Sequence, residues 1–400
     1  MTDPSKSPRA EGTGDNRLAT AGHWREFFSL REKGVYYALI VLVVILAIVT
    51  SYLGRANYLS VQNVNNVLYQ ASLTAIMAVA MTVVLISGNF DLSVASVGAL
   101  AAAVVITLSD TLGFGPAFGI AMLVSMAVGL FNGVVVQFVG INAFIVTLGS
   151  LTAVRGLALI YTEGRSVMSR APESRDAMMA FETGRIEMAY VTLAIALALL
   201  AFGGYRLVRD LGQRRMVLPG PVTMIVVGAL LGALVIGNAF SLGVNKPVAY
   251  MIAFTAIVWW VLTYTNVGRR LYAVGGNPEA ARLSGINVAR YKVMAFVFCS
   301  ATAGFAGILF ASRLRSMNSN VMSGMELTVI AAAILGGTSL FGGKGSVVKS
   351  VGGALLLFSL TNGFNIANLG ANYQGLVEGA VIIIAAAIYT LGGRGGKSAR

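Results

Sequence analysis

Long apolar runs alternate with short polar stretches along almost the whole chain. Most runs are close to 20 residues long, the length at which an α-helix crosses the hydrocarbon core of a bilayer. We predict twelve apolar segments, of which the tenth is too short to cross and is expected to form a half-helix or part of a re-entrant segment. The segments are 35–53, 66–86, 94–108, 117–139, 144–161, 189–208, 217–239, 248–265, 293–312, 327–335, 347–366 and 376–391.

This pattern predicts an all-α, polytopic membrane protein. Hydrophobic residues make up 56% of the 400 residues and charged residues only 11%, whereas a soluble domain carries about 25% charged residues. Too little charge remains to cover a water-facing surface, which excludes a soluble domain. The net charge is +13, but no run of like charges and no aromatic-basic groove pattern accompanies it, so no nucleic-acid partner is expected.

The basic residues instead follow the membrane topology. If the N-terminus lies in the cytoplasm and the spans alternate, 20 of the 29 lysines and arginines fall in cytoplasmic segments and 8 in outside segments, while Arg155 falls inside a span. Such an excess on the cytoplasmic side is the usual bias of membrane proteins. Both termini are therefore predicted to be cytoplasmic.

Three regions follow from this topology: a tail at 1–34, a transmembrane domain at 35–392 and a tail at 393–400. In the first tail, aromatic residues share one helical face, which is typical of an interfacial helix, although a simple basic anchor fits nearly as well. These residues are Trp24, Phe27 and Phe28. The chain has one cysteine, Cys299, and one histidine, His23, which excludes an internal disulfide and a metal site built from these residues.

A faint repeat relates the two halves of the chain. Residues 130–142 and 360–372 match at Leu, Asn, Gly, Gly and Asn without gaps. Each copy follows an apolar run that ends in a glycine-containing break, at 87–93 and at 336–346. Duplicated halves with broken helices are common in transporters, although such matches also arise by chance in a sequence of this composition. We predict an internal duplication.

The second break superficially resembles a phosphate-binding loop at Gly343-Lys344. Thr338 stands where that loop requires its first glycine, and Gly345 stands where it requires serine or threonine. The chain is therefore not expected to bind ATP by this device. A glycine-permitted bend within the membrane is the better interpretation.

Three charged residues lie in or beside the predicted spans: Asp91 in the first break, Arg155 in the fifth span and Glu378 in the last. A carboxylate at membrane depth is costly and is usually functional or paired. We favour a structural role for Asp91, as a cap at the membrane interface where the next helix starts. For Arg155 and Glu378 we favour structural pairing over contact with a substrate.

The loop at 266–292 contains a short capped helix. Asn277 suits the N-cap, Pro278 suits the first helical position, and Glu279 suits the positive first turn, while Gly285 can end the helix. So short a helix is marginal in isolation and needs a partner. That partner is either the protein's own cytoplasmic face or a separate cytoplasmic subunit.

Within this loop, residues 268–286 run Gly-Arg-Arg-Leu-Tyr-Ala-Val-Gly-Gly-Asn-Pro-Glu-Ala-Ala-Arg-Leu-Ser-Gly-Ile. The segment closely resembles the cytoplasmic loop of permease subunits of bacterial ABC-type monosaccharide importers, the ribose, xylose and galactose group. Three more segments resemble the same family: 88–94, 144–148 followed by Arg155-Gly156, and 333–346. Four motifs in the right order make the resemblance specific.

The resemblance implies a path for a monosaccharide through the bacterial cytoplasmic (inner) membrane. A periplasmic sugar-binding protein would deliver the sugar, cytoplasmic ABC ATPase subunits would bind ATP and Mg, and two permease copies would assemble in the membrane lipid. The chain itself would be no enzyme and would bind no cofactor. Its ATPase-coupling loop would comprise Gly276, Asn277, Pro278, Glu279, Ala280, Ala281, Arg282, Leu283 and Gly285.

The chain departs from the family pattern in two places. Asn89 and Ala95 stand where family members commonly have glycine, which leaves the geometry of the first bend open. Residues 166–246 carry an extra hairpin of spans that shorter ribose-type permeases lack. The insertion resembles longer xylose-type or multiple-sugar permeases, which favours xylose or a related sugar.

Two other classes of function fit less well. An autonomous secondary sugar transporter would also suit twelve spans with a repeat, but it should show intramembrane carboxylates or histidines for ion coupling. Only Asp91 and Glu378 qualify. A membrane-embedded enzyme would need a set of catalytic groups, and none is recognisable.

A neutral sugar requires hydrogen-bonding groups and aromatic faces along an apolar path. Each candidate for such a role could equally form hydrogen bonds between helices. The candidates are Asn89, Phe90, Asp91, Asn132, Asn142, Thr338, Ser339, Asn362 and Asn372.

Overall fold

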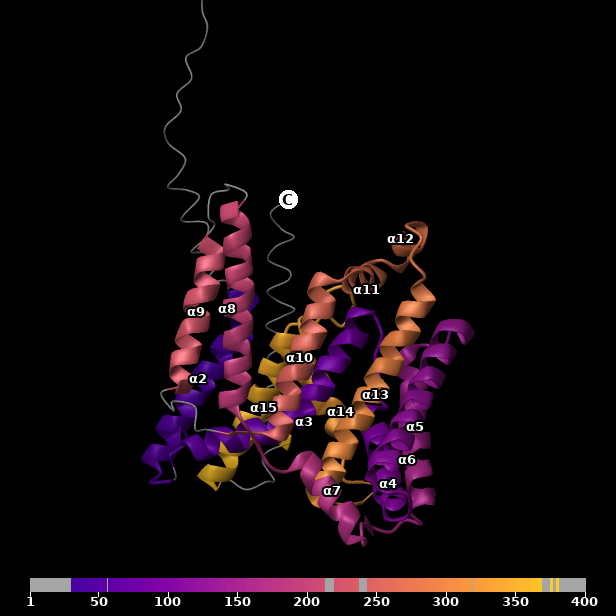
Figure 1. Cartoon of the computed structure of the whole chain (residues 1–400). Helices are drawn as coiled ribbons and strands as arrows, with labels where there is room; N and C mark the ends of the chain where they lie inside the picture. Colours follow the sequence, from indigo (N-terminus) through magenta and orange to yellow (C-terminus); the bar gives the residue numbers. More distant parts are fainter. Residues whose placement is uncertain are drawn as a thin grey trace, which may run out of the picture.

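The computed structural model describes residues 30–55, 57–212, 219–236, 243–318 and 320–368, together with 375–376 and 379–380. In these ranges the chain is almost entirely helical (Figure 1). The long helices are α2 (Leu30–Tyr52), α3 (Val61–Ile86), α4 (Val94–Leu112), α5 (Phe114–Val134) with the π-helix η1 (Val135–Val139), α6 (Ala143–Tyr161), α8 (Met188–Gly212), α9 (Pro219–Ile236), α10 (Lys246–Tyr264), α13 (Val288–Leu314) and α15 (Val347–Ala367). The short elements are α7 (Pro172–Glu182), α11 (Asn266–Gly276), α12 (Pro278–Leu283), α14 (Met325–Leu335), and the strands β1 (Val167–Met168), β2 (Arg185–Glu187), β3 (Gly243–Asn245) and β4 (Ser316–Met317).

Nine helices in the described ranges are long and apolar enough to cross a membrane, and they match nine of the twelve predicted segments. The predicted tenth segment is α14, a helix of 11 residues, so its shortness is confirmed. The seventh is α9, an apolar helix of 18 residues that is not among these nine. The twelfth segment lies almost wholly outside the described residues, as does the interfacial helix expected before Leu30. The count of twelve therefore stays a prediction.

Two helices begin earlier than predicted because polar residues cap them. α3 starts at Val61, where the Ser60 side chain accepts a hydrogen bond from the Asn63 N–H. α13 starts at Val288, where the Asn287 side chain accepts from the Arg290 N–H. Both caps satisfy N–H groups of the first helical turn, so the polar residues extend the helices instead of ending them.

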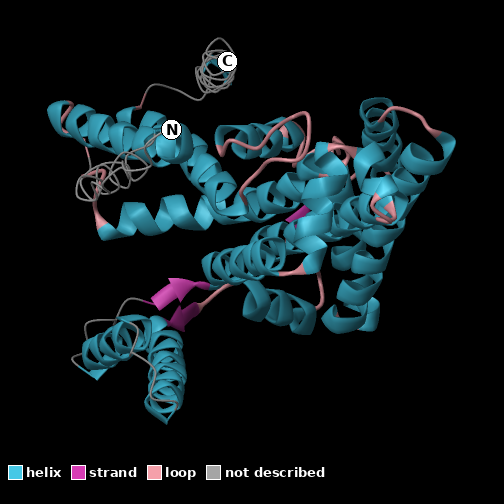
Figure 2. Cartoon of the chain, turned by 90° about the horizontal axis from the view of Figure 1, so that it is seen from above, coloured by secondary structure: helices cyan, strands magenta, loops and turns pink. Residues whose placement is uncertain are grey.

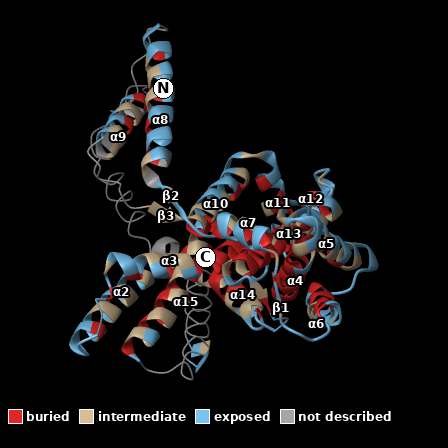
Figure 3. Ribbon diagram, turned by 60° about the horizontal axis from the view of Figure 1, so that its bottom comes forward, coloured by how far each residue is buried: buried red, intermediate tan, exposed pale blue. Residues whose placement is uncertain are grey.

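The core of the molecule consists mainly of α3, α4 and α13, the most enclosed of the long helices (Figure 3). Small residues let these helices approach closely. A Cβ added at Gly98 of α4 would lie 3.0 Å from the Ala303 carbonyl oxygen of α13, and one at Gly129 of α5 would lie 2.7 Å from the Phe296 carbonyl oxygen. Close backbone approach of this kind drives helix association in a membrane, where lipid is as apolar as leucine.

Loops that were predicted to share one side of the membrane share one end of the molecule. At the end that carries α7, β1 pairs with β4 and β2 pairs with β3, both antiparallel. The Asp110 carboxylate accepts there from the Ser169 hydroxyl and from the N–H groups of Arg170 and Ala171. α11 and α12 lie at the opposite end (Figure 1). The alternation of loops thus agrees with the predicted topology.

A buried ion pair fixes α7 across its end of the bundle. Arg313 Nε donates to Glu182 Oε1 at 2.9 Å, and the two side chains are only 18% and 2% exposed. The Tyr69 hydroxyl donates to the same carboxylate oxygen at 2.6 Å. The Arg313 guanidinium also lies 3.8 Å from the centre of the Tyr69 ring. A buried ion pair needs such additional contacts to offset the cost of removing both charges from water.

The insertion at 166–246 contains the predicted helical hairpin, formed by α8 and α9. These two helices pack on each other and stand beside the main bundle, to which the β2–β3 ribbon connects them (Figure 2). A Cβ added at Gly228 would lie 2.9 Å from the Ala196 carbonyl oxygen, so this glycine allows the close crossing. Between β1 and β2 the insertion also contributes α7, which the hydropathy pattern does not predict.

Removing one partner of the buried pair tests its contribution to stability. Glu182→Gln leaves the Arg313 guanidinium without a carboxylate, and losing one partner of a buried ion pair costs about 3 kcal/mol or more. We expect the detergent-solubilised protein to unfold several degrees lower in a thermal-shift measurement. Arg165→Met is the control, because the ion pair between Arg165 and Glu163 is exposed and contributes little. Equal shifts in the two variants would contradict the assignment.

Candidate functional site

The short helix predicted in the loop at 266–292 is confirmed as α12. The Asn277 side chain accepts a hydrogen bond from the Ala280 N–H, Pro278 occupies the first turn, and Gly285 follows with φ +78°. One side of α12 packs on the chain itself, through Ala281 against Val274 and Val288. The other side is exposed and ends in Leu283, which is 85% exposed. The helix is thus anchored on its own protein and still presents a free outer face.

α11 carries α12 and is itself fixed to the second break. Its buried side includes Leu271 and Val274, and the Thr265 side chain accepts from the Gly268 N–H at its start. The Tyr272 hydroxyl donates to the Gly345 carbonyl oxygen at 2.9 Å. Burial raises the pKa of Tyr272 above its usual value, so the phenol stays protonated and remains a donor at neutral pH.

Five glycines, which we call the glycine junction, join α11 to both breaks, backbone against backbone. They are Gly88 in the first break, Gly275 and Gly276 at the end of α11, and Gly342 and Gly343 in the second break. A Cβ at Gly342 would lie 2.5 Å from the Gly275 carbonyl oxygen, and one at Gly343 would lie 2.6 Å from the Gly276 Cα.

The tightest position of the glycine junction is Gly275, where an added Cβ would overlap the Ile86 carbonyl oxygen. That same oxygen accepts the Gly343 N–H at 2.9 Å. Gly88, Gly342 and Gly343 also have positive φ angles, which residues with a side chain rarely adopt. The three segments therefore meet at one point because these positions are glycine.

Asp91 differs from the predicted cap at the membrane interface, because it is fully enclosed by protein. Its Oδ1 accepts from the Ser93 N–H at 2.9 Å and from the Ser93 hydroxyl at 2.5 Å, while the Ser300 hydroxyl of α13 lies 3.5 Å from Oδ2. At the start of α4 these hydrogen bonds come from Ser93, the residue before the helix, and not from N–H groups of the first helical turn. The prediction of an interfacial position was wrong because α5, α6 and α13 cover the break, which the local sequence does not reveal.

Asn132 extends this polar group across two further helices. Its Nδ2 donates to the Ser93 hydroxyl oxygen at 3.0 Å, and its Oδ1 accepts from the Ser150 hydroxyl of α6. Asn132 is fully buried. In this structure it serves as a hydrogen-bonding link between α4, α5 and α6, the alternative that the sequence left open.

Three of the predicted path residues meet at an open pocket of about 410 Å³ beside the first break. Asn89 and Phe90 line it from the break, and Asn142 lines it from the start of α6. Asn142 also caps α6, since its side chain accepts from the Phe144 N–H. The pocket adjoins the glycine junction through Gly88, which is one of its lining residues.

The other path candidates lie apart from this pocket. Thr338 is buried near the Ser350 hydroxyl, and the Ser339 hydroxyl accepts from the Phe341 N–H within the second break. The Asn362 amide donates to Asn63 Oδ1 at 3.0 Å, between α15 and α3. Asn372 lies outside the described residues. Their assignment to a path stays a prediction.

Arg155 has no carboxylate partner among the described residues, and its Nε is buried without a hydrogen bond. The pairing expected for it is therefore not found in that part of the chain. Glu378 lies outside the described residues, so the expectation for its partner stays a prediction.

Residues 63–386 match the family described as branched-chain amino acid transport system / permease component. The chain belongs to this permease family. The ribose import permease protein RbsC of Escherichia coli (strain K12) is 34% identical over 365 residues, which cover 90% of this chain and 95% of that protein. The xylose transport system permease protein XylH of the same strain is 36% identical over 336 residues, covering 82% and 84%. RbsC of Bacillus subtilis (strain 168) is 30% identical over 358 residues, covering 89% and 92%. No solved structure is significantly similar to the chain.

The predicted family is confirmed, and with it the expectation of a multi-pass membrane protein that is a transporter subunit. The short helix α12 and both breaks were predicted from the sequence. The contact of the preceding helix, α11, with both breaks was not predicted. The available signal was the glycines at 275–276 and 342–343, of which the first pair was assigned only to the loop at 266–292 and the second pair only to a bend.

An alanine scan of the glycine junction tests whether the close contact is essential. Gly275→Ala places a Cβ against the Ile86 carbonyl oxygen, and overpacking of this kind typically costs about 1–3 kcal/mol. Gly276→Ala is the matched control, since its nearest neighbour, the Gly343 Cα, would be 3.9 Å away. We expect a lower unfolding temperature in detergent for Gly275→Ala alone. Equal stability of both variants would contradict the contact.

Proposed function

We propose that this permease is the transmembrane subunit of an ATP-driven ABC importer for a monosaccharide. The observation that carries the proposal is α12, a capped helix that is exposed on its outer face and joined through the glycine junction to both breaks. Two relatives named for ribose import and xylose transport support a sugar as the substrate. The similarity to both leaves xylose or a related sugar as our proposal for this chain.

The proposal assigns the α11 end to the cytoplasm and the α7 end to the outside of the inner membrane. The excess of basic residues in the loops of the α11 end supports this orientation. Cytoplasmic ATPase subunits would then contact α12 and would hold ATP and Mg themselves. A periplasmic sugar-binding protein would approach the α7 end, and a second copy of the chain would complete the path within the lipid.

The glycine junction suggests how a displacement of α12 is transmitted to the two breaks. Because α11 ends against both breaks without intervening side chains, a displacement of α12 cannot be absorbed by rotamer changes at these contacts. We propose that α12 and the two breaks move as one unit. The pocket lined by Asn89, Phe90 and Asn142 adjoins that unit, and its mix of amide and aromatic groups suits a weakly bound sugar at the inner end of the path.

Charge reversals on the exposed face of α12 test the coupling role. Glu279 and Arg282 are exposed and have no ion-pair partner among the described residues. Glu279→Lys or Arg282→Glu should therefore leave the fold intact and weaken retention of the ATPase, by about tenfold in affinity if the contact is central to the interface. The measurement is co-purification of the ATPase with the tagged permease, together with ATP-driven sugar uptake in proteoliposomes.

Arg165→Glu at the α7 end is the control, since it makes the same charge change as Arg282→Glu and a charge reversal of the same size as Glu279→Lys. Normal ATPase retention and normal ATP-driven uptake in both α12 variants would contradict the proposal that α12 couples the ATPase to transport. Sugar uptake by the permease alone, without ATP or a partner, would instead identify an autonomous secondary transporter.

A further inference from the structure

The end of α10 and the start of α11 form a corner that carries exposed aromatic and basic side chains. α10 is long and apolar enough to cross a membrane, and Thr265, which has an extended backbone conformation, joins it to α11. α11 then lies across the ends of the long helices (Figure 1). We use the name α10–α11 corner for five residues, which are Trp259, Trp260 and Tyr264 of α10 and Arg269 and Arg270 of α11.

The aromatic side chains of the corner face outward. Trp259, Trp260 and Tyr264 are 41%, 56% and 59% exposed. The rings of Trp259 and Tyr264 contact each other in a nearly perpendicular arrangement, with 5.5 Å between their centroids. Tryptophan and tyrosine at the end of a spanning helix typically lie at the level of the lipid headgroups, because their rings are apolar at one end and polar at the other. These residues therefore place the corner at the membrane surface.

Both arginines of the corner are exposed, and neither has a carboxylate partner among the described residues. Arg269 Nη2 donates to the side-chain oxygen of Asn266 at 2.6 Å, a neutral acceptor that leaves the positive charge uncompensated. No aspartate or glutamate occurs anywhere from Lys246 to Pro278. The N-terminus of α11, the positive end of its helix dipole, lies at the same place. The corner is thus suited to an anion.

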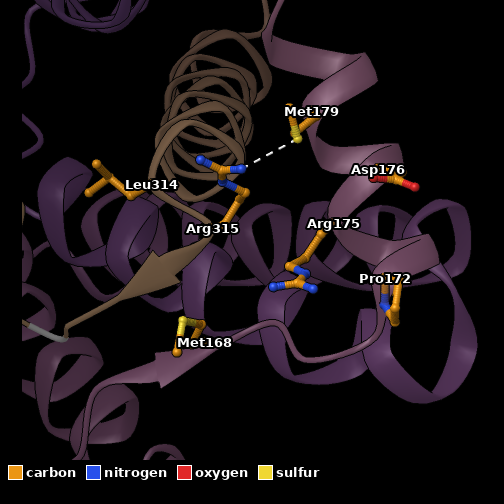
Figure 4. A pocket seen from close by; sticks show the side chains of 7 residues that line it. All are labelled: Met168, Pro172, Arg175, Asp176, Met179, Leu314 and Arg315. Carbon is orange, nitrogen blue, oxygen red and sulfur yellow. Dashed lines mark hydrogen bonds between the residues drawn. The ribbon is translucent and has the colours of Figure 1, made fainter.

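A pocket at the α7 end provides a comparison. Arg175 and Arg315 line this pocket, whose volume is about 450 Å³ (Figure 4). Asp176 shares its lining, and no aromatic residue does. Exposed arginine alone therefore does not distinguish the α10–α11 corner. Its distinguishing feature is the combination of arginines that no acidic residue accompanies with exposed tryptophan and tyrosine on a spanning helix.

We propose that the α10–α11 corner binds an anionic phospholipid, whose phosphate pairs with Arg269 and Arg270 while its glycerol and upper acyl chains contact the three aromatic rings. A guanidinium group binds phosphate oxygens through parallel hydrogen bonds. Basic sites beside spanning helices recognise anionic headgroups in the same way. A lipid bound here would hold the start of α11 at the membrane surface, while Gly275 and Gly276 at its other end contact the two breaks.

The ATPase fits this corner less well than a lipid does. The exposed face that we propose for the ATPase belongs to α12, which follows the opposite end of α11. The exposed rings of the corner belong to a helix that is apolar enough to span the membrane, so acyl chains are their natural neighbours. This inference goes beyond the proposed function and does not depend on it.

The tryptophans of the corner can report on the bound lipid, because Trp24 is the only other tryptophan in the chain. The full-length Trp24→Phe protein is reconstituted in vesicles of phosphatidylcholine with a minor share of phosphatidylglycerol. One of the two lipids carries bromine on its acyl chains, which quenches tryptophan fluorescence on contact. At equal mole fractions, brominated phosphatidylglycerol should quench more strongly than brominated phosphatidylcholine.

Arg269→Gln and Arg270→Gln, each made in the Trp24→Phe protein, should lower this preference for phosphatidylglycerol by about fivefold. Added salt should lower it as well, since the proposed contact joins opposite charges. Arg290→Gln is the matched control and should leave the preference unchanged. Arg290 is an exposed arginine at the start of α13, which follows α12, and it lies outside the corner.

Equal quenching by the two brominated lipids in the Trp24→Phe protein would overturn the proposal. A preference that both arginine variants leave intact would overturn it too. If these variants lose the ATPase during co-purification while the lipid preference is unchanged, the corner belongs to the ATPase interface instead. The quenching measurement requires neither sugar nor ATP, so its failure would leave the proposed function standing.

Discussion

The contact between the α11 end and the Ile86 carbonyl oxygen is the constraint on which the arrangement of the functional segments depends. That oxygen accepts the Gly343 N–H, and Gly275 lies so close to it that no side chain fits. Inside a membrane protein, a break in a helix leaves backbone groups that water cannot satisfy. Here the two breaks and the end of α11 satisfy and enclose one another. The loop that carries α12 is thereby connected directly to irregular backbone at the α11 end of the bundle.

Polar side chains within the core support this arrangement. Asp91, Asn132 and their serine partners connect the first break to α5, α6 and α13 through hydrogen bonds, and such fully connected networks hold one packing arrangement against its alternatives. The α7 end is fixed by different means, a buried ion pair with an aromatic partner. The α7 end of the permease is thus held by a buried ion pair, whereas at the α11 end glycine residues meet in the glycine junction.

Periodicity and composition predicted most of the helices, because a bilayer demands apolar runs of fixed length. The α12 helix was predictable to within one residue, since Asn277, Pro278 and Gly285 are local signals with local effects. The amphipathic α7 was not predicted, because a helix of 11 residues with mixed polarity does not form an apolar run in the sequence.

Two further features were not predicted: the burial of Asp91 and the contact between Gly88, Gly275 and Gly343. Both depend on which distant segments pack together. No local pattern encodes that choice. The family resemblance identified each of the three motifs separately, but their contact is a property of the folded chain. The same holds for Asn132, whose partners come from α4 and α6.

The most direct test of the account measures whether α12 and the second break move as one unit. Spin labels at Leu283→Cys and Phe341→Cys, both highly exposed positions, can be combined with a reference label at Arg165→Cys after the single native cysteine is replaced by Cys299→Ser. Pulsed electron paramagnetic resonance of the reconstituted complex would compare the nucleotide-free and ATP-bound states. If α12 and the second break move as one unit, the 283–341 distance stays constant while the 341–165 distance changes. A changing 283–341 distance with a constant 341–165 distance would contradict it.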